Sequence, residues 1–434
     1  MRRIARLLKR LTKGKEVQNA GWLIGGKIAQ MLLSLLVGVL SARYLGPNNY
    51  GLINYGMAYV NFFMSFCTLG INSIILKEFI DDPEGQGCTI GTTIVLRAIS
   101  SFFSSIMIIG IVAVLDNGEP LTIAVAALCS ISLVFQVFDT INYWFQAQYK
   151  SKITAIVTLV AYIITSTYKI LLLILGKSVE WFAFASSIDY IIVGVLLLSI
   201  YKKNNGPKFK ISFAKGKFLL RSSYHYILSG MMVSIYAQTD KLMLKQMIDE
   251  STVGYYTIAT NICAMWTFVL AAIIDSIHPT ILRYHNQDYQ SYERKNRQLY
   301  AIVFYISVFV ALLIHLFGDY VVIILYGEAY MPAVVPLKIV TWYVAFSYLG
   351  AARNAWIICE NNQKYLKYIY FGAAVINIIL NLMLIPQYST EGAAIASLIT
   401  QFCTSIVLPF FIPDMRPNCK LMVEGILLKD TFGR

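Results

Sequence analysis

Charged residues are scarce in this chain of 434 residues. They make up 14% of the sequence, whereas an ordinary soluble domain has about 25%. Hydrophobic residues account for 57%, and several stretches with hardly a charge are long enough to cross a hydrocarbon layer of ~30 Å. These properties exclude a water-soluble fold. They predict an all-α polytopic membrane protein.

Cysteine pairs and catalytic motifs are also lacking. The seven cysteines are scattered without a C-x-x-C pair, which indicates small buried apolar residues and not a disulfide or metal framework. The sequence has no Asp-x-Asp motif and no phosphate-binding loop, and its four histidines lack the spacing of metal ligands. We also expect no loop longer than about sixteen residues, which is short for a membrane-bound polymerase or transferase. The sequence therefore predicts neither an enzyme nor direct use of ATP, and it calls for no cofactor or metal.

Apolar segments separated by polar or turn-forming residues predict twelve membrane-spanning helices. The expected spans are residues 20–42, 52–76, 89–115, 121–147, 153–175, 180–201, 218–244, 253–280, 298–317, 333–358, 364–385 and 391–412. Residues 318–332 contain a short apolar run, which we expect to lie at the membrane interface. The basic N-terminus could open a signal peptide. However, the apolar run that follows has no cleavage pattern, so we expect a retained first helix.

The distribution of Lys and Arg predicts the orientation, because basic residues are retained on the cytoplasmic side. With the basic N-terminal tail inside, every inner loop is basic, whereas the outer loops hold only Arg43, Lys177 and Lys245. Both termini are therefore expected in the cytoplasm. The net charge of +13 is explained without nucleic acid as a partner.

The longest basic linker divides the expected helices into two sets of six. The predicted organisation is a basic cytoplasmic tail at 1–19, a first lobe at 20–201, a linker at 202–217, a second lobe at 218–413 and a cytoplasmic tail at 414–434. The string YGLINYG at 50–56 resembles VGYYTIA at 253–259, and each opens the second helix of its half. This match predicts parallel repeats related by a pseudo-two-fold axis, as in many alternating-access transporters. Chance similarity between apolar sequences is the alternative.

Positive side chains within the expected spans point to an anionic cargo. A charge at the bilayer centre costs at least ~2.5 to 3.5 kcal/mol, so such groups usually face a partner or a watery cavity. We place Lys27, Arg97 and Arg353 in an inward-facing cavity. Arg221 and Lys241 lie near helix ends, where reaching out to the interface is the alternative. Arg and Lys bind phosphate oxygens well, which favours a phosphorylated cargo.

Two acidic residues are candidates for ion coupling. Asp189 lies near the middle of its span, and Asp240 lies in the seventh span. Either carboxylate could take up a proton or a cation during transport. For Asp240 the alternative is a structural ion pair with the adjacent Lys241.

Several strings together resemble bacterial polysaccharide-unit flippases, which belong to the superfamily of the multidrug and toxic-compound extrusion transporters and the peptidoglycan-precursor flippases. The strings occur in family order from about residue 19 to 412: ARYLGP at 42–47, LGIN at 69–72, WFQA at 144–147, TDKLML at 239–244, LYG at 325–327, LIP at 384–386 and EGAAIA at 391–396, with Asn377 and Asn381 before the last two. Most of these residues are expected to be architectural, and the two Asn are expected to bond between helices. Arg43 and Lys77 are charged members of this pattern, and we assign them to the substrate cavity with Arg97, Arg221 and Arg353.

This resemblance implies two six-helix lobes around a cavity that moves a polyprenyl-pyrophosphate-linked oligosaccharide across the bacterial cytoplasmic (inner) membrane. Membrane lipids, and other membrane proteins of polysaccharide assembly, are the further partners that it implies. Three alternatives stay open. They are a cation-coupled multidrug exporter, a flippase for lipid-linked peptidoglycan precursor, and a membrane polymerase or ligase of the same pathway. The expected excess of cations in the cavity argues against the exporter, and the short loops argue against the polymerase.

Overall fold

The structure, a computed structural model, is helical throughout the part of the chain that it describes. That part covers residues 15–285 and 287–431, apart from the side chains of residues 15–29, 32 and 229. No β-strand occurs in it. The expected all-α architecture is therefore confirmed for these residues.

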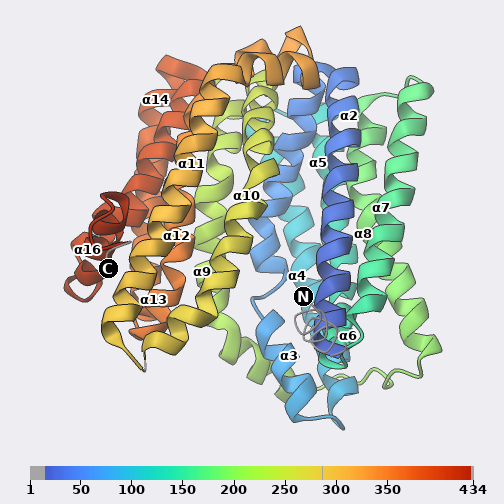
Figure 1. Cartoon of the computed structure of the whole chain (residues 1–434). Helices are drawn as coiled ribbons and strands as arrows, with labels where there is room; N and C mark the ends of the chain where they lie inside the picture. Colours follow the sequence, from blue (N-terminus) through green and yellow to red (C-terminus); the bar gives the residue numbers. More distant parts are fainter. Residues whose placement is uncertain (1–14, 286, 432–434) are drawn as a thin grey trace, which may run out of the picture. The chain divides into compact units, whose positions relative to one another are not determined.

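The helices follow one another with short connections (Figure 1). They are α2 (Lys15–Cys67), α3 (Asn72–Asp81), α4 (Gln86–Leu115), α5 (Pro120–Phe135), η1 (Gln136–Phe138), α6 (Asp139–Ala147), α7 (Ser151–Ile174), α8 (Val179–Lys203), α9 (Phe213–Met247), α10 (Glu250–His285), α11 (Tyr289–Tyr326), η2 (Glu328–Ala333), α12 (Val334–Ala352), α13 (Asn354–Cys359), η3 (Gln363–Tyr365), α14 (Leu366–Phe402), η4 (Cys403–Val407), α15 (Leu408–Phe410), η5 (Pro413–Met415) and α16 (Arg416–Ile426).

Nine helical segments within the described residues are long and apolar enough to cross a membrane. Two of them contain a residue whose backbone is not helical. Gly46 interrupts α2 with φ 69°, and Ser389 interrupts α14 with φ 51°. Helix α9 is not among the nine segments, although its 35 residues exceed the ~20 that a span needs. The chain is thus a multi-pass membrane protein.

The chain forms two compact units. The first comprises residues 1–45 and 55–234, and the second comprises residues 46–54 and 235–434. In the first unit, α4 packs against α5, and α8 packs against both α5 and α7. The basic linker after α8 is held against α4, where the backbone N–H of Lys210 donates to the carbonyl of Gly87 at 3.1 Å. An added Cβ at Gly87 would lie 2.4 Å from the carbonyl oxygen of Lys208, so only glycine permits this approach.

In the second unit, α10, α11 and α12 run side by side, and α12 also packs against α14 (Figure 1). Residues 46–54 from the first half of the chain belong to this unit. An added Cβ at Gly51 would lie 1.8 Å from the carbonyl oxygen of Glu250, and one at Gly254 would lie 2.3 Å from that of Pro47. Gly51 therefore contacts the residue four positions before Gly254, and Gly254 contacts the residue four positions before Gly51.

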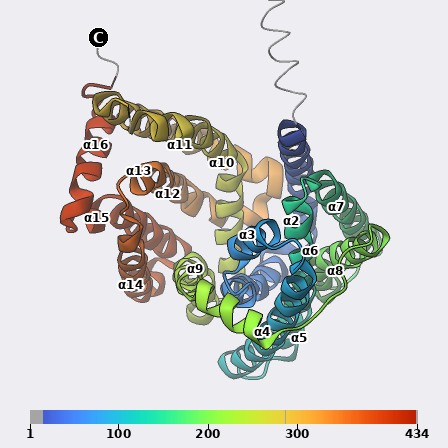
Figure 2. The same cartoon turned by 90° about the horizontal axis from the view of Figure 1, so that it is seen from below.

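Three elements differ from the expected pattern. The span expected at 52–76 is broken between α2 and α3, where Leu69 and Gly70 have positive φ values. The short apolar run expected at the interface instead continues α11 to Tyr326. The expected C-terminal tail contains α16, which packs against α11 (Figure 2) and is fixed by an ion pair of 2.7 Å between Arg297 and Glu424.

Outside the membrane, α11 begins with a side-chain cap. The carboxylate of Asp288 accepts a hydrogen bond from the backbone N–H of Gln290 at 3.1 Å. Hydrogen bonding from Ser291 lowers the pKa of the Asp288 carboxyl from its ordinary value. The charged carboxylate therefore satisfies N–H groups that an α-helix leaves unpaired at its start.

Candidate functional site

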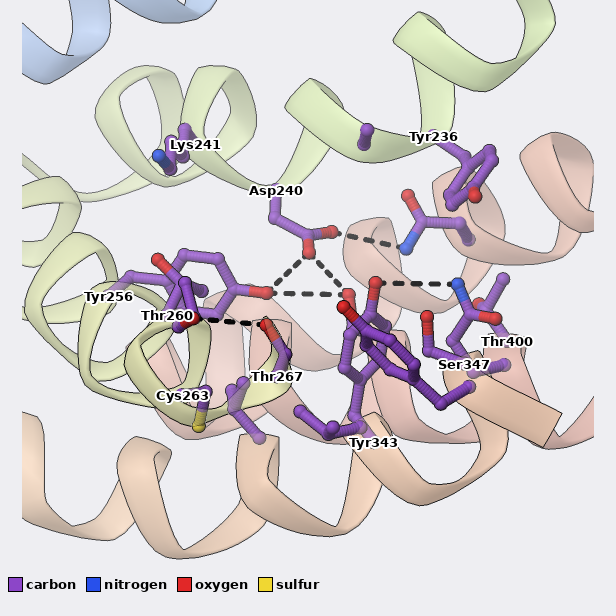
Figure 3. Close-up of a pocket in the computed structure, with 18 residues that line it drawn as sticks. Tyr236, Asp240, Lys241, Tyr256, Thr260, Cys263, Thr267, Tyr343, Ser347 and Thr400 are labelled. Atoms are coloured by element: carbon purple, nitrogen blue, oxygen red, sulfur yellow. Dashed lines mark hydrogen bonds between the residues drawn. The ribbon is translucent and has the colours of Figure 1, made fainter. Parts of the chain in front are cut away.

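A buried carboxylate lies at the centre of a polar cluster in the second unit. Asp240 on α9 is only 4% exposed. Its Oδ1 accepts hydrogen bonds from the side-chain amides of Asn381 at 2.7 Å and Asn377 at 3.1 Å. Its Oδ2 accepts hydrogen bonds from the hydroxyl of Tyr256 at 2.5 Å and from that of Ser397. Four neutral donors from two other helices thus surround one carboxylate. Figure 3 shows the Asp240 carboxylate with the Tyr256 hydroxyl that donates to it.

The kink in α14 brings three of these donors together. Asn377 and Asn381 are four residues apart, so they share a face of the helix before the kink, and Ser397 lies after the kink. Within the turn, an added Cβ at Gly392 would lie 2.3 Å from the carbonyl oxygen of Leu384. The turn can therefore close only with glycine at this position. The motif at 384–396 builds this reversal, which places both arms of α14 against Asp240.

A cavity of about 290 Å³ opens beside this carboxylate. Its polar lining comes from α9, α10, α12 and α14 (Figure 3). The polar lining residues are Tyr236, Asp240, Lys241, Tyr256, Thr260, Cys263, Thr267, Tyr343, Ser347, Tyr348, Asn377, Ser397, Thr400 and Gln401. Small-molecule sites usually occupy ~300 to 1,000 Å³, so this cavity suits an ion with a few waters better than a sugar headgroup.

The cluster has the chemistry of a site for a small cation. An ionised carboxylate in a poorly solvated place needs compensating hydrogen bonds or a counter-charge. Besides the carboxylate, the buried Oδ1 of Asn381 has no hydrogen-bond partner, although buried polar atoms are nearly always paired. Carboxylate, amide and hydroxyl oxygens are ligands that hard cations prefer. Among the described residues, no three His, Cys, Asp or Glu side chains gather in a way that could hold a metal ion.

Lys241 lines the same cavity. In Figure 3 its ammonium points away from the Asp240 carboxylate, although the two residues are adjacent in sequence. Successive residues on a helix point about 100° apart, so neighbours in sequence do not face each other. The side chains that bond to Asp240 are therefore the four donors named above.

Arg97 lies inside the first unit and is 2% exposed. Its guanidinium donates to the hydroxyl of Thr140 at 3.1 Å, to the carbonyl of Thr68 at 3.4 Å and to the side-chain oxygen of Asn72. The Nε of Arg97 is buried without a partner. Asp139 is its acidic electrostatic partner. Arg97 therefore bridges α4, α6 and the break between α2 and α3.

Arg353 lies inside the second unit and is 1% exposed. It donates to the backbone carbonyls of Thr404 and Ser405, both at 3.2 Å. These carbonyls belong to the π-helical turn η4, where i→i+5 bonding replaces the regular α-helical pattern. Like Arg97, Arg353 has a buried Nε without a partner. Neither arginine lines the cavity beside Asp240, and their assignment to a substrate cavity remains a prediction.

None of the other predicted site residues with a described side chain is among the residues that line the cavity beside Asp240. Arg43 and Arg221 are exposed, and the ammonium of Lys77 lies 4.0 Å from the carboxylate of Asp81. Asp189 interacts electrostatically with Lys169, and its Oδ1 is buried without a hydrogen-bond partner. The side chain of Lys27 lies outside the described residues.

Sequence reasoning missed several members of the cluster. Asn377 and Asn381 were expected only to bond between helices, which the hydrogen bonds to Asp240 confirm. Tyr256 and Ser397 were not singled out. The available signal was the recurrence of Asn at i and i+4 in an apolar helix, since buried amides need partners. No sequence signal identified Ser397, because serine is common in membrane helices.

Membrane-length helices define a multi-pass membrane protein, and its second unit holds a buried carboxylate with a cavity beside it. A family model described as "Polysaccharide biosynthesis protein" matches residues 17–285, more than half of the chain. The chain belongs to this family, as the strings in its sequence indicate. Among curated proteins, the capsular polysaccharide biosynthesis protein CapF of Staphylococcus aureus is 21% identical over 408 residues, which covers 91% of this chain and 98% of that protein.

Solved structures share the fold. The lipid II flippase MurJ in an inward closed conformation is 15% identical with a TM-score of 0.70, covering 94% of this chain and 91% of that chain. An inward-facing multidrug resistance transporter of the MATE family is 15% identical with a TM-score of 0.67, covering 91% and 96% of the two chains. At this identity the similarity establishes the fold alone.

Proposed function

We propose that this protein is a flippase that translocates polyprenyl-pyrophosphate-linked oligosaccharide repeat units across the bacterial cytoplasmic membrane. The observation that carries the proposal is membership of the polysaccharide biosynthesis family over residues 17–285. The similarity to CapF along nearly its whole length supports the same pathway. The transporter fold favours movement of the substrate over its chemical conversion, so we propose that the protein is not an enzyme.

The same proposal includes twelve spans in two lobes of six helices. Dividing α2 at Gly46 and α14 at Ser389 and adding α9 to the nine apolar segments brings the number to twelve. This number agrees with the sequence pattern. An even number of spans puts both termini on the same side of the membrane, and the positive-inside rule favours the cytoplasmic side.

Unaided movement of the headgroup is slow because its hydroxyl and phosphate groups lose their water in the bilayer. Each unpaired polar group costs several kcal/mol in an apolar medium, and an ionised one costs far more. We assign Lys27, Arg43, Lys77, Arg97, Arg221 and Arg353 to the side chains that replace this water. The lipid tail stays in the bilayer while the headgroup passes between the lobes by alternating access.

Ion coupling is the proposed source of energy, and Asp240 is its proposed site. The carboxylate is buried, bears four hydrogen bonds from neutral donors and borders a cavity of ionic size. Uptake of a cation or proton there neutralises the charge that the four donors otherwise stabilise. One charge that crosses a potential of 100 mV supplies about 2.3 kcal/mol.

The experiment that tests the proposal measures the leaflet distribution of the lipid-linked oligosaccharide. Depletion of the protein should cause accumulation in the inner leaflet, and wild-type protein supplied in trans should reverse it. Drug susceptibility measured in the same cells tests the exporter alternative. An unchanged leaflet distribution together with altered drug susceptibility would contradict the proposal and favour the exporter.

A further inference from the structure

A second cavity, of about 510 Å³, lies further along α10 towards its C-terminal end. Its lining includes Asp275 and His278 from α10, Tyr348 and Asn354 from α12 and α13, and Gln363. The function proposed above uses none of these side chains. The cavity is nearly twice as large as the one beside Asp240.

Two groups in this cavity call for water or an ion. Asp275 is an exposed acid in an apolar membrane helix, where a charge without solvent would cost at least ~2.5 kcal/mol. The Nε2 atom of His278 is buried without a hydrogen-bond partner. Polar cavities of this size normally hold water that satisfies such atoms.

The linings of both cavities include residues of α10 and α12. On α10, Thr260, Cys263 and Thr267 line the first cavity, and Asp275 and His278 line the second. Successive members of this set are three, four or eight residues apart, and this spacing keeps them on one side of the helix.

Tyr348 is the point at which the cavities meet, because its side chain lines both of them. Beyond it, Ser347 on α12 continues the polar lining towards Asp240. Along this route, the wide polar mouth is followed by the side chain of Tyr348 and then by the smaller chamber, which ends at the carboxylate of Asp240. A negative group at each end attracts positive charge, while the ammonium of Lys241, which also lines the smaller chamber, points away from Asp240.

We propose that the Asp275–His278 cavity is the inner mouth of a path along which a small monovalent cation or a proton reaches Asp240. The proposal rests on the proposed function, since it gives the coupling ion of that function its route. Arg283 lies in the last turn of α10, and Arg294, Lys295 and Arg297 lie near the start of α11, so the positive-inside rule puts this end of α10 at the cytoplasmic surface. Tyr348 forms the constriction between mouth and chamber.

A native thiol reports on this path. Cys263 is 3% exposed and lines the chamber beside Asp240, whereas Cys129 in the first unit is 0% exposed. Inside-out and right-side-out membrane vesicles are treated with a membrane-impermeant cationic methanethiosulfonate and, separately, with its anionic analogue. The modified fraction of each cysteine is then measured by mass spectrometry. We expect the cationic reagent to modify Cys263 at least tenfold faster in inside-out vesicles than in right-side-out vesicles, and Cys129 to stay unmodified.

Matched variants then test the route. Ala271→Leu fills the mouth and should slow modification of Cys263 at least tenfold, whereas Ala272→Leu changes the adjacent residue, which lines neither cavity, and should leave the rate unchanged. Asp275→Asn should reduce the preference for the cationic over the anionic reagent about fivefold. If the Ala271→Leu protein fails to insert into the membrane, Ala351→Leu on α12 provides a second way to obstruct the same mouth.

Equal modification from both sides, equal rates for the two reagents, or no effect of Ala271→Leu and Ala351→Leu would each overturn the path. The labelling needs no lipid-linked substrate, so its outcome is independent of the leaflet assay. One outcome is that Cys263 is labelled, that the Leu variants slow its labelling, and that the leaflet distribution stays normal after depletion. This outcome would support the path and reject the flippase. Failure of the labelling expectations together with inner-leaflet accumulation after depletion would reject the path alone.

Discussion

The two units each bury a charge, but they stabilise it differently. In the first unit, the guanidinium of Arg97 is enclosed by acceptors from neighbouring segments. In the second unit, the carboxylate of Asp240 receives four donors and borders a cavity. A buried charge whose partners fill its surroundings fixes helices together. One that keeps free space beside it can also exchange a ligand.

Composition alone does not distinguish a buried charge that fixes helices together from one that can exchange a ligand. Both residues count equally as intramembrane charges in the sequence, and each costs at least ~2.5 kcal/mol if left unpaired at the bilayer centre. Their different surroundings predict different consequences of mutation. Loss of Arg97 should affect stability in addition to transport, whereas loss of Asp240 should mainly affect transport.

The largest expected effect is that of Arg97→Ala on stability. The substitution removes three hydrogen bonds from a charged donor and leaves a cavity, so we expect a loss of about 3 kcal/mol in the free energy of unfolding. Thermal unfolding of the purified protein in detergent measures it. Arg221→Ala, at an exposed position, is the control and should change stability by less than ~0.5 kcal/mol. A stable but inactive Arg97→Ala protein would instead assign Arg97 to the substrate path, as the sequence predicted.

Asp240→Asn should lower the ion-dependent rate of flipping about a hundredfold, equivalent to roughly 3 kcal/mol. The amide preserves the size of the side chain but cannot hold a cation or accept a proton. The rate is measured in vesicles with and without an imposed ion gradient, with the amount of inserted protein as a control. Asp189→Asn is the matched acid of the first unit and should alter coupling less than threefold. If the two variants exchanged these effects, Asp189 would be the coupling residue.

The smallest effect is expected for Lys241→Met. Lys241 lines the cavity of Asp240, yet its ammonium points away from the carboxylate (Figure 3). Methionine keeps most of the apolar stem, so the same vesicle assay should show a change of less than threefold. A loss as large as that of Asp240→Asn would show that the two residues act as an ion pair, the alternative that the sequence left open.

The fold could be predicted further than the site. Hydropathy located α4, α7 and α8 to within a few residues because a span must be about 20 apolar residues long. It did not detect the break at Leu69 and Gly70, since apolar residues continue across it. It also missed α16, whose stability depends on packing against α11 through contacts such as Arg297 with Glu424.

Only part of the site could be predicted from the sequence. Asp240 was recognised as a candidate because an acid in an apolar span is costly. Its partners were not, because Tyr256 and Ser397 lie 16 and 157 residues away in sequence and meet it only after folding. Arg97 and Arg353 were expected to face a cavity, and whether they contact the headgroup during transport remains a prediction.

The sequence by itself determined a multi-pass helical membrane protein of the polysaccharide biosynthesis family, because apolar length and local motifs are properties of contiguous residues. Only the tertiary structure decided which charge has free space beside it. The kink at Ser389 turns α14 back on itself and joins its two arms to α9 and α10 around Asp240. Cavities arise where packed helices leave volume unfilled, and no single segment encodes that volume.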